Sequence, residues 1–514
     1  MKRIILALMF AFFGLSTHAQ ITFVKSYYNS IFYYGRSFTN SGQQTSDGGY
    51  IMLNYDLKEI PPYYMTLIKT NADGDTLWTR IYANYFGYSV IQTNDGGYII
   101  SGTNQDSTIG RAHVCLIKTN SSGDTLWTKC YGSINNVAGF YGYSVKQTND
   151  NGYIVVGASD SADYGLPDVL LIKTNSIGDT IWTKTYGGSN NDFAVSVELT
   201  SDGGYIITGG TSSFGNGRVY LIKTNSMGDI LWTKHYGSSG GWDAGYSVKQ
   251  TSDDGYIIAG IYNQIYYYLI KTNSIGDTLW TKTYFCEVFN VNDSEDEAYN
   301  VQKTSEGGYI ISGSIYNSSG DSYIGLIKTD STGDILWTSY YVGRIDGPGT
   351  FQQTADGGYI IFGESIIKTD SNGNSGCSEY SLPTTIVSFP THVSNTATIV
   401  KSGCIVNNPS ISVESGGDTV TTVCFSAGIN EIKTNYYVSL YPNPTYGTFT
   451  LSYNSQTPIL NSQLKIYDVL GQEVYTQLIT DNSSIINLPQ LSNGVYFYQL
   501  TNNTETYRGK FVKQ

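Results

Sequence analysis

One sequence unit is repeated seven times in this chain, with a period of about 50 residues. Its clearest copy reads TSDGGYII from Thr200 and, after a variable loop, LIKTNSMGDILWTK from Leu221. The tyrosine of the first half recurs at Tyr50, Tyr98, Tyr153, Tyr205, Tyr256, Tyr309 and Tyr359, and the tryptophan of the second half at Trp78, Trp127, Trp182, Trp232, Trp280 and Trp337. A repeat of this length indicates small structural units that stack in a line or close into a ring.

Each copy predicts four short strands. In one copy these are residues 246–250, 256–259, 268–271 and 278–282, which are rich in Ile, Val, Thr and aromatic residues. The turns between the first and second strands, and between the third and fourth, carry glycine where a tight hairpin needs a positive φ. The sequence therefore predicts an all-β chain with a seven-bladed β-propeller.

The two ends of the repeat region favour a closed ring. The seventh copy stops after residues 366–370, so its tryptophan strand is missing. Residues 21–28 resemble that strand without the tryptophan and lie just ahead of the first copy. We expect this N-terminal strand to complete the last blade and leave no open sheet edge.

The N-terminus has the pattern of a signal peptide over residues 1–19: a basic start, a short apolar run and a small-residue site that predicts cleavage between Ala19 and Gln20. No other long apolar stretch follows, so we expect no transmembrane segment. The propeller is expected over residues 20–372. The net charge of −13, with only 14% charged residues, argues against a nucleic-acid partner.

Residues 373–434 shift to Ser, Thr, Val, Asn and Gly, and we expect an extended or thin β linker there. Because an exported protein can form disulfides, Cys377 and Cys424 are a candidate pair. Cys115 and Cys130 lie on one hairpin, where a loop closed at Gly123 sets Cys115 opposite Lys129. That register also pairs Ile117 with Trp127 and disfavours a Cys115–Cys130 bond.

The last eighty residues, 435–514, predict a small antiparallel β-sandwich with Pro-Asn-Pro and glycine turns. Its motifs are LYPNPTYG from Leu440, LKIYDVLGQEV from Leu464, LSNGVYF from Leu491 and GKFVK from Gly509. In these motifs and their order, the segment resembles the type A C-terminal sorting domain of the type IX secretion system.

The resemblance implies that the chain reaches the periplasm and that the outer-membrane exporter then reads this domain. The protein would be released or held at the outer cell surface, with the type IX machinery as its partner. The motif positions carry over to Pro442, Asn443, Pro444, Gly447, Asp468, Gly471, Gly494, Tyr496 and Lys510. The repeats also resemble, more loosely, the β-propeller repeat proteins that often precede such domains.

A binding site is expected on the face whose loops vary between copies, because binding groups gather on variable loops over a rigid scaffold. Aromatic side chains in or beside those loops suit sugar rings. The candidates are Tyr85, Phe86, Phe140, Tyr141, Tyr164, Phe193, Trp242 and Tyr262. Trp242 is the one tryptophan outside the repeat pattern. The alternative is that these rings pack the blades together.

Catalytic and metal motifs are weak. The histidines downstream of residue 19, His113, His235 and His392, are far apart, and the Asp-Gly-Gly carboxylates occupy turn positions. The Asn-x-x-Gly-Asp turns lack the second carboxylate that calcium needs in most copies, and they miss the spacing of a sialidase Asp-box. We therefore predict no catalytic residue, no metal site and no cofactor.

Three functions fit this sequence. The first is a secreted or surface-displayed propeller that binds an extracellular glycan or protein. The second is an extracellular polysaccharide-acting enzyme, a hydrolase or lyase, on a propeller scaffold. The third is a structural adhesin or spacer whose repeats bind nothing small.

Overall fold

The computed structural model divides into two compact units, Met1–Gly428 and Ile429–Gln514. It describes residues 21–513 except for 30–36, 57–63, 107–110, 133–138, 160–165, 215–216, 238–240, 287–295, 317–321, 344–350, 364, 377–378, 382–383, 388–391, 396–398, 402–404, 408–412, 416–417, 428–436, 442–444, 455–461, 470, 481–482 and 502–505. The expected all-β class is confirmed, since every regular element of the described residues is a strand. Among these residues there is no helix long and apolar enough to cross a membrane.

The first unit contains seven antiparallel sheets of five strands each, which we number by their order in the chain. Sheet 1 holds β2 (Ser37–Gln44), β3 (Tyr50–Asp56), β4 (Tyr64–Thr70), β5 (Thr76–Ala83) and β34 (Val413–Ser415). Sheet 2 holds β6 (Tyr85–Gln92), β7 (Tyr98–Asp106), β8 (Arg111–Thr119), β9 (Thr125–Gly132) and β33 (Ile405–Asn407). Sheet 3 holds β10 (Phe140–Gln147), β11 (Tyr153–Ser159), β12 (Asp168–Thr174), β13 (Thr180–Gly187) and β32 (Ile399–Lys401).

The remaining sheets follow the same order. Sheet 4 holds β14 (Asp192–Leu199), β15 (Tyr205–Thr211), β16 (Arg218–Thr224), β17 (Ile230–Gly237) and β31 (His392–Asn395). Sheet 5 holds β18 (Ala244–Gln250), β19 (Tyr256–Tyr262), β20 (Tyr266–Thr272), β21 (Thr278–Cys286) and β30 (Thr384–Val387). Sheet 6 holds β22 (Glu297–Lys303), β23 (Tyr309–Tyr316), β24 (Ser322–Thr329), β25 (Ile335–Val342) and β29 (Glu379–Ser381). Sheet 7 holds β26 (Phe351–Gln353), β27 (Tyr359–Phe362), β28 (Ile366–Thr369), β1 (Ile21–Asn29) and β35 (Asp418–Ala427).

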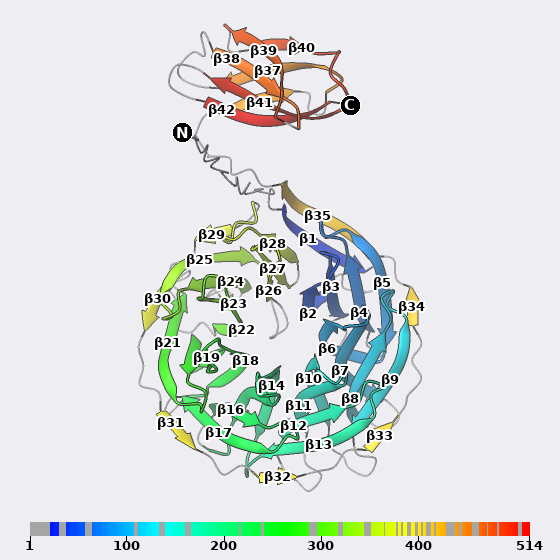
Figure 1. The fold of residues 1–514 in the computed structure, drawn as a ribbon, viewed down its shortest axis with the longest axis vertical. Coiled ribbons are helices and arrows are strands. Elements are labelled where there is room, and N and C mark those ends of the chain that lie inside the picture. The colour runs from blue at the N-terminus through cyan, green and yellow to red at the C-terminus, as the bar shows by residue number, and fades with distance from the viewer. Residues whose placement is uncertain are drawn as a thin grey trace, which may run out of the picture. The chain divides into compact units, whose positions relative to one another are not determined.

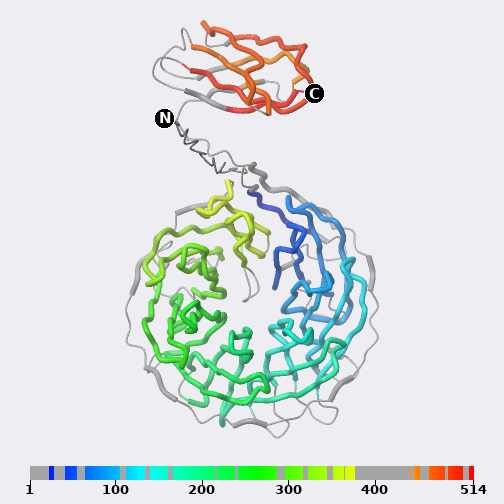
Figure 2. Tube along the Cα trace, in the orientation of Figure 1, coloured from blue at the N-terminus to red at the C-terminus, as the bar shows by residue number. Residues whose placement is uncertain are grey.

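Figure 1 shows these sheets set around a common centre, with the first strand of each repeat innermost. In Figure 2 the colour passes from blue to yellow-green as successive repeats follow one another around that centre. The first strand of a repeat is therefore the one that faces the middle of the array, and the fourth lies toward its rim.

Each sheet holds the four expected strands, with β1 as the fourth of sheet 7, and a fifth strand that was not expected is added at its outer edge. It comes from residues 379–427, within the segment expected to be an extended or thin β linker. This segment runs backwards around the array: β29 pairs with β25, β30 with β21, β31 with β17, β32 with β13, β33 with β9, β34 with β5 and β35 with β1. We call these seven strands the belt. It pairs the outer edges of the repeats, which would otherwise expose unpaired backbone groups.

Strand β1 joins the two ends of the repeat region. It pairs antiparallel with β28 on one side, Val24 lying opposite Ile367, and with β35 of the belt on the other. Phe23 is fully buried against Tyr50 of sheet 1 and against the last repeat. The first strand of the described chain therefore lies inside the sheet of the last repeat.

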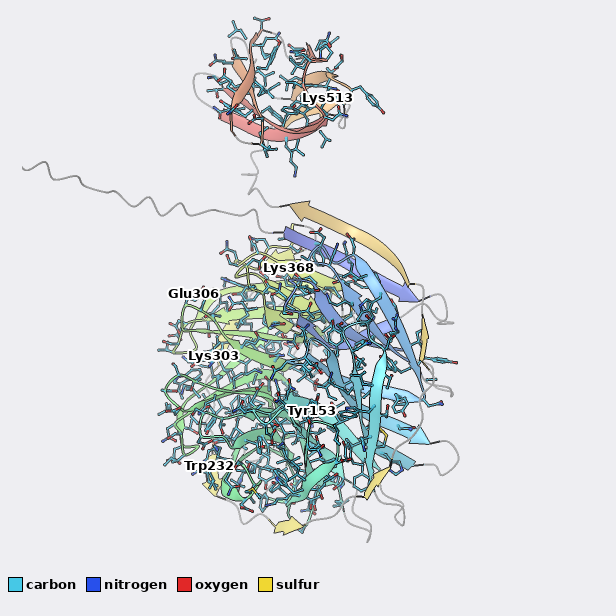
Figure 3. The ribbon with its side chains drawn as sticks, turned by 45° about the vertical axis from the view of Figure 1, so that its right-hand side comes forward. Tyr153, Trp232, Lys303, Glu306, Lys368 and Lys513 are labelled. Atoms are coloured by element: carbon cyan, nitrogen blue, oxygen red, sulfur yellow. A yellow bond between two sulfur atoms is a disulfide. The ribbon has the colours of Figure 1, made fainter. Side chains whose placement is uncertain are left out.

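Neighbouring sheets are joined by a repeated set of contacts at their outer strands. In six cases the repeat tryptophan packs on the repeat tyrosine of the next sheet, as Trp182 does on Tyr205 with ring centroids 6.2 Å apart. Between sheets 7 and 1, Phe23 and Tyr50 make this contact at 6.1 Å. Tyr153 and Trp232, labelled in Figure 3, belong to the same series.

A buried hydrogen bond accompanies each of these packing contacts. A tyrosine of the fourth strand, which is β1 in sheet 7, donates its hydroxyl to a turn-glycine carbonyl of the next sheet. The seven pairs are Tyr27–Gly74, Tyr82–Gly123, Tyr131–Gly178, Tyr186–Gly228, Tyr236–Gly276, Tyr284–Gly333 and Tyr341–Gly373. The series includes a bond from sheet 7 to sheet 1, made by Tyr27.

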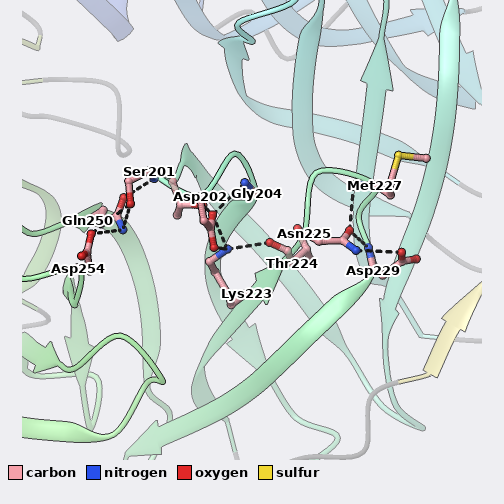
Figure 4. A network of polar contacts seen from close by, with 11 residues as sticks. Ser201, Asp202, Gly204, Lys223, Thr224, Asn225, Met227, Asp229, Gln250 and Asp254 are labelled. Atoms are coloured by element: carbon pink, nitrogen blue, oxygen red, sulfur yellow. Dashed lines mark hydrogen bonds and ion pairs between the residues drawn. The ribbon is translucent and has the colours of Figure 1, made fainter.

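The turns explain why the repeat keeps its polar residues (Figure 4). The Asp202 carboxylate accepts hydrogen bonds from the Thr200 hydroxyl at 2.5 Å and the Gly204 amide at 3.0 Å, and Lys223 lies 2.8 Å away. In the second turn, Asn225 accepts from the amides of Met227 and Asp229, both at 2.9 Å. These contacts hold the hairpins together, in agreement with turn roles for these residues.

The register of the β8–β9 hairpin corrects one expectation. Asn120 lies opposite Asp124, as predicted, but Leu126 then forms a β-bulge in which one residue of β9 has no partner. Beyond the bulge every pairing is shifted by one, so Trp127 faces Lys118 rather than Ile117. Cys115 therefore faces Cys130, and the two form a disulfide that the predicted register disfavoured.

The second unit is a small β-sandwich of two sheets. One has the order β36 (Tyr437–Tyr441), β37 (Thr448–Asn454) and β40 (Ser483–Asn487); the other has the order β39 (Glu473–Ile479), β38 (Ser462–Tyr467), β41 (Gly494–Thr501) and β42 (Thr506–Lys513). Their apolar faces share one core, which includes Phe449, Leu464, Ile486 and Phe511. This agrees with the alternating pattern of the last eighty residues.

Candidate binding site

A cavity of ≈ 600 Å³ lies at the centre of the seven sheets. Residues from all seven innermost strands, β2, β6, β10, β14, β18, β22 and β26, line it. Because these strands come from different repeats, each position around the cavity can carry a different side chain on the same backbone frame. The cavity is thus the place where the repeat can vary without losing its fold.

Glutamine side chains link several of the innermost strands to one another. The side-chain carbonyl of Gln43 accepts a hydrogen bond from the Gln92 amide at 3.1 Å, and that of Gln302 accepts from Gln353 at 2.9 Å. Gln352 accepts from the Gln44 amide at 2.6 Å, which joins sheet 7 to sheet 1. These bonds satisfy backbone donors that no strand reaches on this side.

The equivalent positions of sheets 3, 4 and 5 carry charge instead. Glu198 lies between Lys146 and Lys249, which both contact the same carboxylate oxygen, Lys146 at 2.9 Å. The three side chains are 18–28% exposed. Burial alone would raise the pKa of Glu198, but the two ammonium groups lower it to about 2. Burial also lowers the pKa of Lys249 from its usual value.

Tyrosines occupy one equivalent position in four innermost strands. Tyr88 and Tyr143 line the cavity and pack edge to face, with centroids 5.1 Å apart. Tyr141 stacks on Tyr143 at 6.1 Å with an interplanar angle of 6°. Three half-buried rings therefore run from the cavity toward the loop that precedes β10. Across the cavity, Tyr246 and Tyr299 form a second pair at 5.3 Å.

Sequence reasoning selected Tyr141 but missed Tyr88 and Tyr143. Both occupy a fixed place in the repeat, three residues before the position of Lys146, so their recurrence was visible. Recurrence alone does not distinguish a binding residue from a scaffold residue. In the structure, Tyr88 and Tyr143 are each the unpaired residue of a β-bulge, which alters the course of the strand.

Three of the predicted binding residues are buried. Tyr85, Phe140 and Tyr262 are 4%, 7% and 5% exposed and belong to core clusters between sheets. Burial also raises the pKa of Tyr85 to about 12. Phe86, Tyr141, Phe193 and Trp242 are half-buried. Tyr164 lies outside the described residues, as do Ala19, Gln20 and Cys377, so neither the cleavage site nor the Cys377–Cys424 pair is described.

Trp242 and Phe193 form the other aromatic pair of the predicted set. Their rings stack with centroids 6.4 Å apart and an interplanar angle of 14°. The backbone of Gly217 lies so close that a Cβ there would fall 2.3 Å from the indole ring. The Asp243 amide also donates to the Gly217 carbonyl at 3.1 Å, so the tryptophan is held between two loops.

Five turn aspartates of the described residues form ion pairs within their own sheets, and the imidazole of His235 is buried. The turn aspartates Asp47, Asp95, Asp150, Asp202 and Asp253 each pair with a buried lysine of their own sheet. His235 is 7% exposed, and burial together with Arg218 lowers its pKa to about 4. Within the described residues, no three His, Cys, Asp or Glu side chains are grouped as a metal site requires.

The sorting motif residues of the second unit occupy turns and core. Gly447 and Gly471 take positive φ values of 106° and 78°, and the Gln472 amide donates to the Asp468 carboxylate at 2.9 Å. Tyr496 is 7% exposed and donates to the Ser492 carbonyl at 2.8 Å. Gly494 begins β41, and Lys510 of β42 lies opposite Phe497. Pro442, Asn443 and Pro444 lie outside the described residues.

Residues 439–514 match the family described as the secretion system C-terminal sorting domain. The chain therefore ends in a type IX secretion sorting domain, and the resemblance seen in the sequence is confirmed. It follows that the protein is exported, to the cell surface or beyond, and that it interacts with the secretion machinery.

Solved structures resemble the chain only distantly. PorZ, described as an essential bacterial surface component of the type-IX secretion system of Porphyromonas gingivalis, aligns over 91% of this chain and 58% of its own, with 9% identity and a TM-score of 0.35. A tetra-tandem repeat from the extending region of a large adhesion protein aligns over 80% of this chain and 97% of its own, with 12% identity and a TM-score of 0.12. No curated protein matches the sequence. Likenesses this weak carry no conclusion about function.

Proposed function

We propose that the first unit is a closed seven-bladed β-propeller whose last blade is completed by the N-terminal strand. Support comes from the β1–β28 pairing, which places the N-terminal strand in the sheet of the last repeat. Two contacts also link sheet 7 to sheet 1: the Tyr27–Gly74 hydrogen bond and the Gln352–Gln44 bond. Residues 1–19 would be the signal peptide, removed between Ala19 and Gln20. The belt would then surround the outer edge of the ring.

The same proposal extends to function: the exported propeller binds an extracellular glycan without chemically changing it. The observation that carries this is the run of half-buried rings Tyr141, Tyr143 and Tyr88, which leads into the central cavity. Sugars present C–H faces that pack on aromatic rings and hydroxyl groups that need hydrogen-bond partners. The cavity supplies both, because serine, asparagine and glutamine side chains line it beside the tyrosines.

The Phe193–Trp242 pair offers a second contact surface. Two half-buried rings stacked in parallel and held by Gly217 form a rigid platform, and rigid aromatic groups bind with little loss of side-chain entropy. A polysaccharide longer than the cavity would reach this platform through the variable loops. Tyr85, Phe140 and Tyr262, being buried, would support the site rather than contact the glycan.

The test is a glycan array probed with the secreted full-length protein and with Tyr141→Ala, Trp242→Ala and Tyr446→Ala. Tyr446 is the matched control because its ring is 81% exposed and lies in the second unit. We expect Tyr141→Ala to lower binding at least about tenfold with no change in melting temperature, and Tyr446→Ala to leave binding unchanged.

Two results would contradict the proposal. One is unchanged binding in both Tyr141→Ala and Trp242→Ala. The other is the release of reducing ends or unsaturated products from a polysaccharide panel, which would favour an enzyme.

A further inference from the structure

The central cavity carries more charge than its role in joining the sheets requires. Seven equivalent positions of the innermost strands are occupied by Gln43, Ile91, Lys146, Glu198, Lys249, Gln302 and Gln352. At three of them a neutral glutamine links one strand to its neighbour through a backbone amide. Lys146, Glu198 and Lys249 instead link neighbouring strands through ion pairs between their side chains, although a neutral glutamine makes the connection elsewhere in the array.

The positive and negative side chains that line the cavity do not balance in charge. Its lining includes three lysines, Lys146, Lys249 and Lys303, but a single acid, Glu198. Lys146 and Lys249 share one oxygen of that carboxylate. Lys303 is exposed to the cavity and has no acidic partner among the described residues. The lining thus has an excess of two positive charges in a chain whose net charge is −13.

Lys303 acts on the same group of charges. It lies in β22, the strand that follows β18 of Lys249 around the cavity (Figure 3). Burial lowers the pKa of Lys249, and the charges of Lys146 and Lys303 lower it further, against the opposing effect of Glu198. In the other sheets the position of Lys303 is held by Gln44, Gln92, Gln147, Leu199, Gln250 and Gln353. The glutamines Gln44, Gln92, Gln147 and Gln250 accept a hydrogen bond from the turn of a neighbouring sheet.

We propose that the cavity binds an acidic glycan, with a carboxylate of a uronic-acid-type sugar held between Lys303 and the Lys146–Glu198–Lys249 cluster. This inference rests on the proposed glycan-binding function and adds the class of glycan. An ammonium–carboxylate hydrogen bond is about twice as strong as a neutral one, and it selects acidic over neutral sugars. Lys303 needs no rearrangement to make it, because it has no competing acid in the described residues.

The spacing of the aromatic and basic groups suits an oligosaccharide. Tyr143 and Lys146 lie three residues apart on β10, so their backbones are at most about 10 Å apart along the strand, and the β-bulge at Tyr143 shortens this separation. A sugar stacked against Tyr143 and an acidic sugar at Lys146 would therefore be different units of one chain. The net charge of −13 disfavours polyanions near the protein as a whole, so the excess of positive charge in the cavity would be a local exception.

The experiment measures the binding of three trisaccharides to the full-length secreted protein by calorimetry. They are a uronic-acid trisaccharide, the neutral trisaccharide made from it by reducing its carboxyl groups, and that reduced trisaccharide carrying one sulfate ester. The variants are Lys303→Gln, Lys303→Arg and, as a control in the second unit, Lys465→Gln. We expect the uronic-acid ligand to bind about tenfold more tightly than its reduced form.

Lys303→Gln should remove most of that preference, whereas Lys303→Arg and Lys465→Gln should keep it. Raising the salt concentration should weaken binding of the acidic ligand selectively. Equal or tighter binding of the sulfated ligand would support the anion site and assign sulfate as its ligand. Binding of the neutral ligand alone would overturn this inference and leave the proposed function intact. If the protein binds neither the acidic nor the neutral trisaccharides, the proposed function and this inference both fail.

Discussion

Two regions of the seven sheets use the same repeat in opposite ways. At the outer strands, a tyrosine hydroxyl and a turn-glycine carbonyl form the same buried bond in all seven sheets, and an aromatic ring packs on the next sheet beside it. At the innermost strands, equivalent positions hold Gln, Ile, Lys or Glu. The outer contacts hold neighbouring sheets together, and uniform contacts there leave the inner strands free to differ. A ligand site is therefore expected at the innermost strands, where equivalent positions of the repeats carry different side chains.

The largest expected effect comes from the outer region at β1. Phe23→Ala removes a fully buried ring that takes the place of the repeat tryptophan between sheets 7 and 1. We expect it to lower the free energy of unfolding by about 3–5 kcal/mol, measured by urea denaturation. Tyr446→Ala, with its exposed ring, should change it by less than about 0.5 kcal/mol. A loss below about 1 kcal/mol for Phe23→Ala would mean that β1 does not complete the last sheet.

The disulfide tests an outer contact that does not repeat. Cys115 and Cys130 close a loop with a sequence separation of 15, and replacing both by alanine should cost about 3 kcal/mol. Mass spectrometry of the native secreted protein should find these two thiols blocked. Free thiols at both positions would contradict the disulfide and would agree with the register that the sequence alone suggested.

Removing one hydroxyl measures how uniform the outer contacts are. Tyr186→Phe and Tyr27→Phe each leave a glycine carbonyl without its partner, and each should cost about 1–2 kcal/mol. Equal losses would mean that the junction between sheets 7 and 1 is as tight as the junction between sheets 3 and 4. A loss for Tyr186→Phe alone would indicate that the array is open between sheets 7 and 1.

The smallest expected effect is the change in acid stability when the turn aspartate Asp202 is replaced. Lys223, Thr200 and Gly204 lower the pKa of Asp202 to about 2, against the opposing effect of partial burial. Since the folded pKa lies below the unfolded value, this stabilisation is complete above about pH 4 and is lost as the pH falls toward 2. The Asp202 side chain is 53% exposed, so Asp202→Asn should flatten the acid limb by less than about 1 kcal/mol. An acid limb as steep in the variant as in the parent would contradict this assignment.

The all-β class, the repeating strands and the secretion domain could be predicted because each depends on local chemistry. Glycine at positive φ, β-branched strands and the spacing of turn residues are properties of a few neighbouring residues, as in the turn of Asp202 and Gly204. The sorting domain was recognisable because its motifs are specific and occur in order.

What the sequence did not reveal depends on contacts between distant segments. Nothing in the strands of residues 379–427 indicates that each pairs with a different repeat. Six of the seven have only three or four residues, and a strand of that length carries no signature of its partner. The bulge at Leu126 shifts the register of β9 by one residue, and no local pattern distinguishes a bulged strand from a regular one. Tyr88 and Tyr143 were overlooked because their value as a surface depends on which rings neighbouring sheets bring beside them.

The belt also determines how the protein responds to being pulled from its C-terminal side. Each belt strand is attached to a different sheet, and β35, the last of them, lies directly against β1. Tension entering the first unit near residue 428 would reach the nine paired residues of β35 first, and only after their release would β34 and then β33 bear the load. The belt would detach one sheet at a time. Sheet 7, which contains β1, would be the first to lose its belt strand.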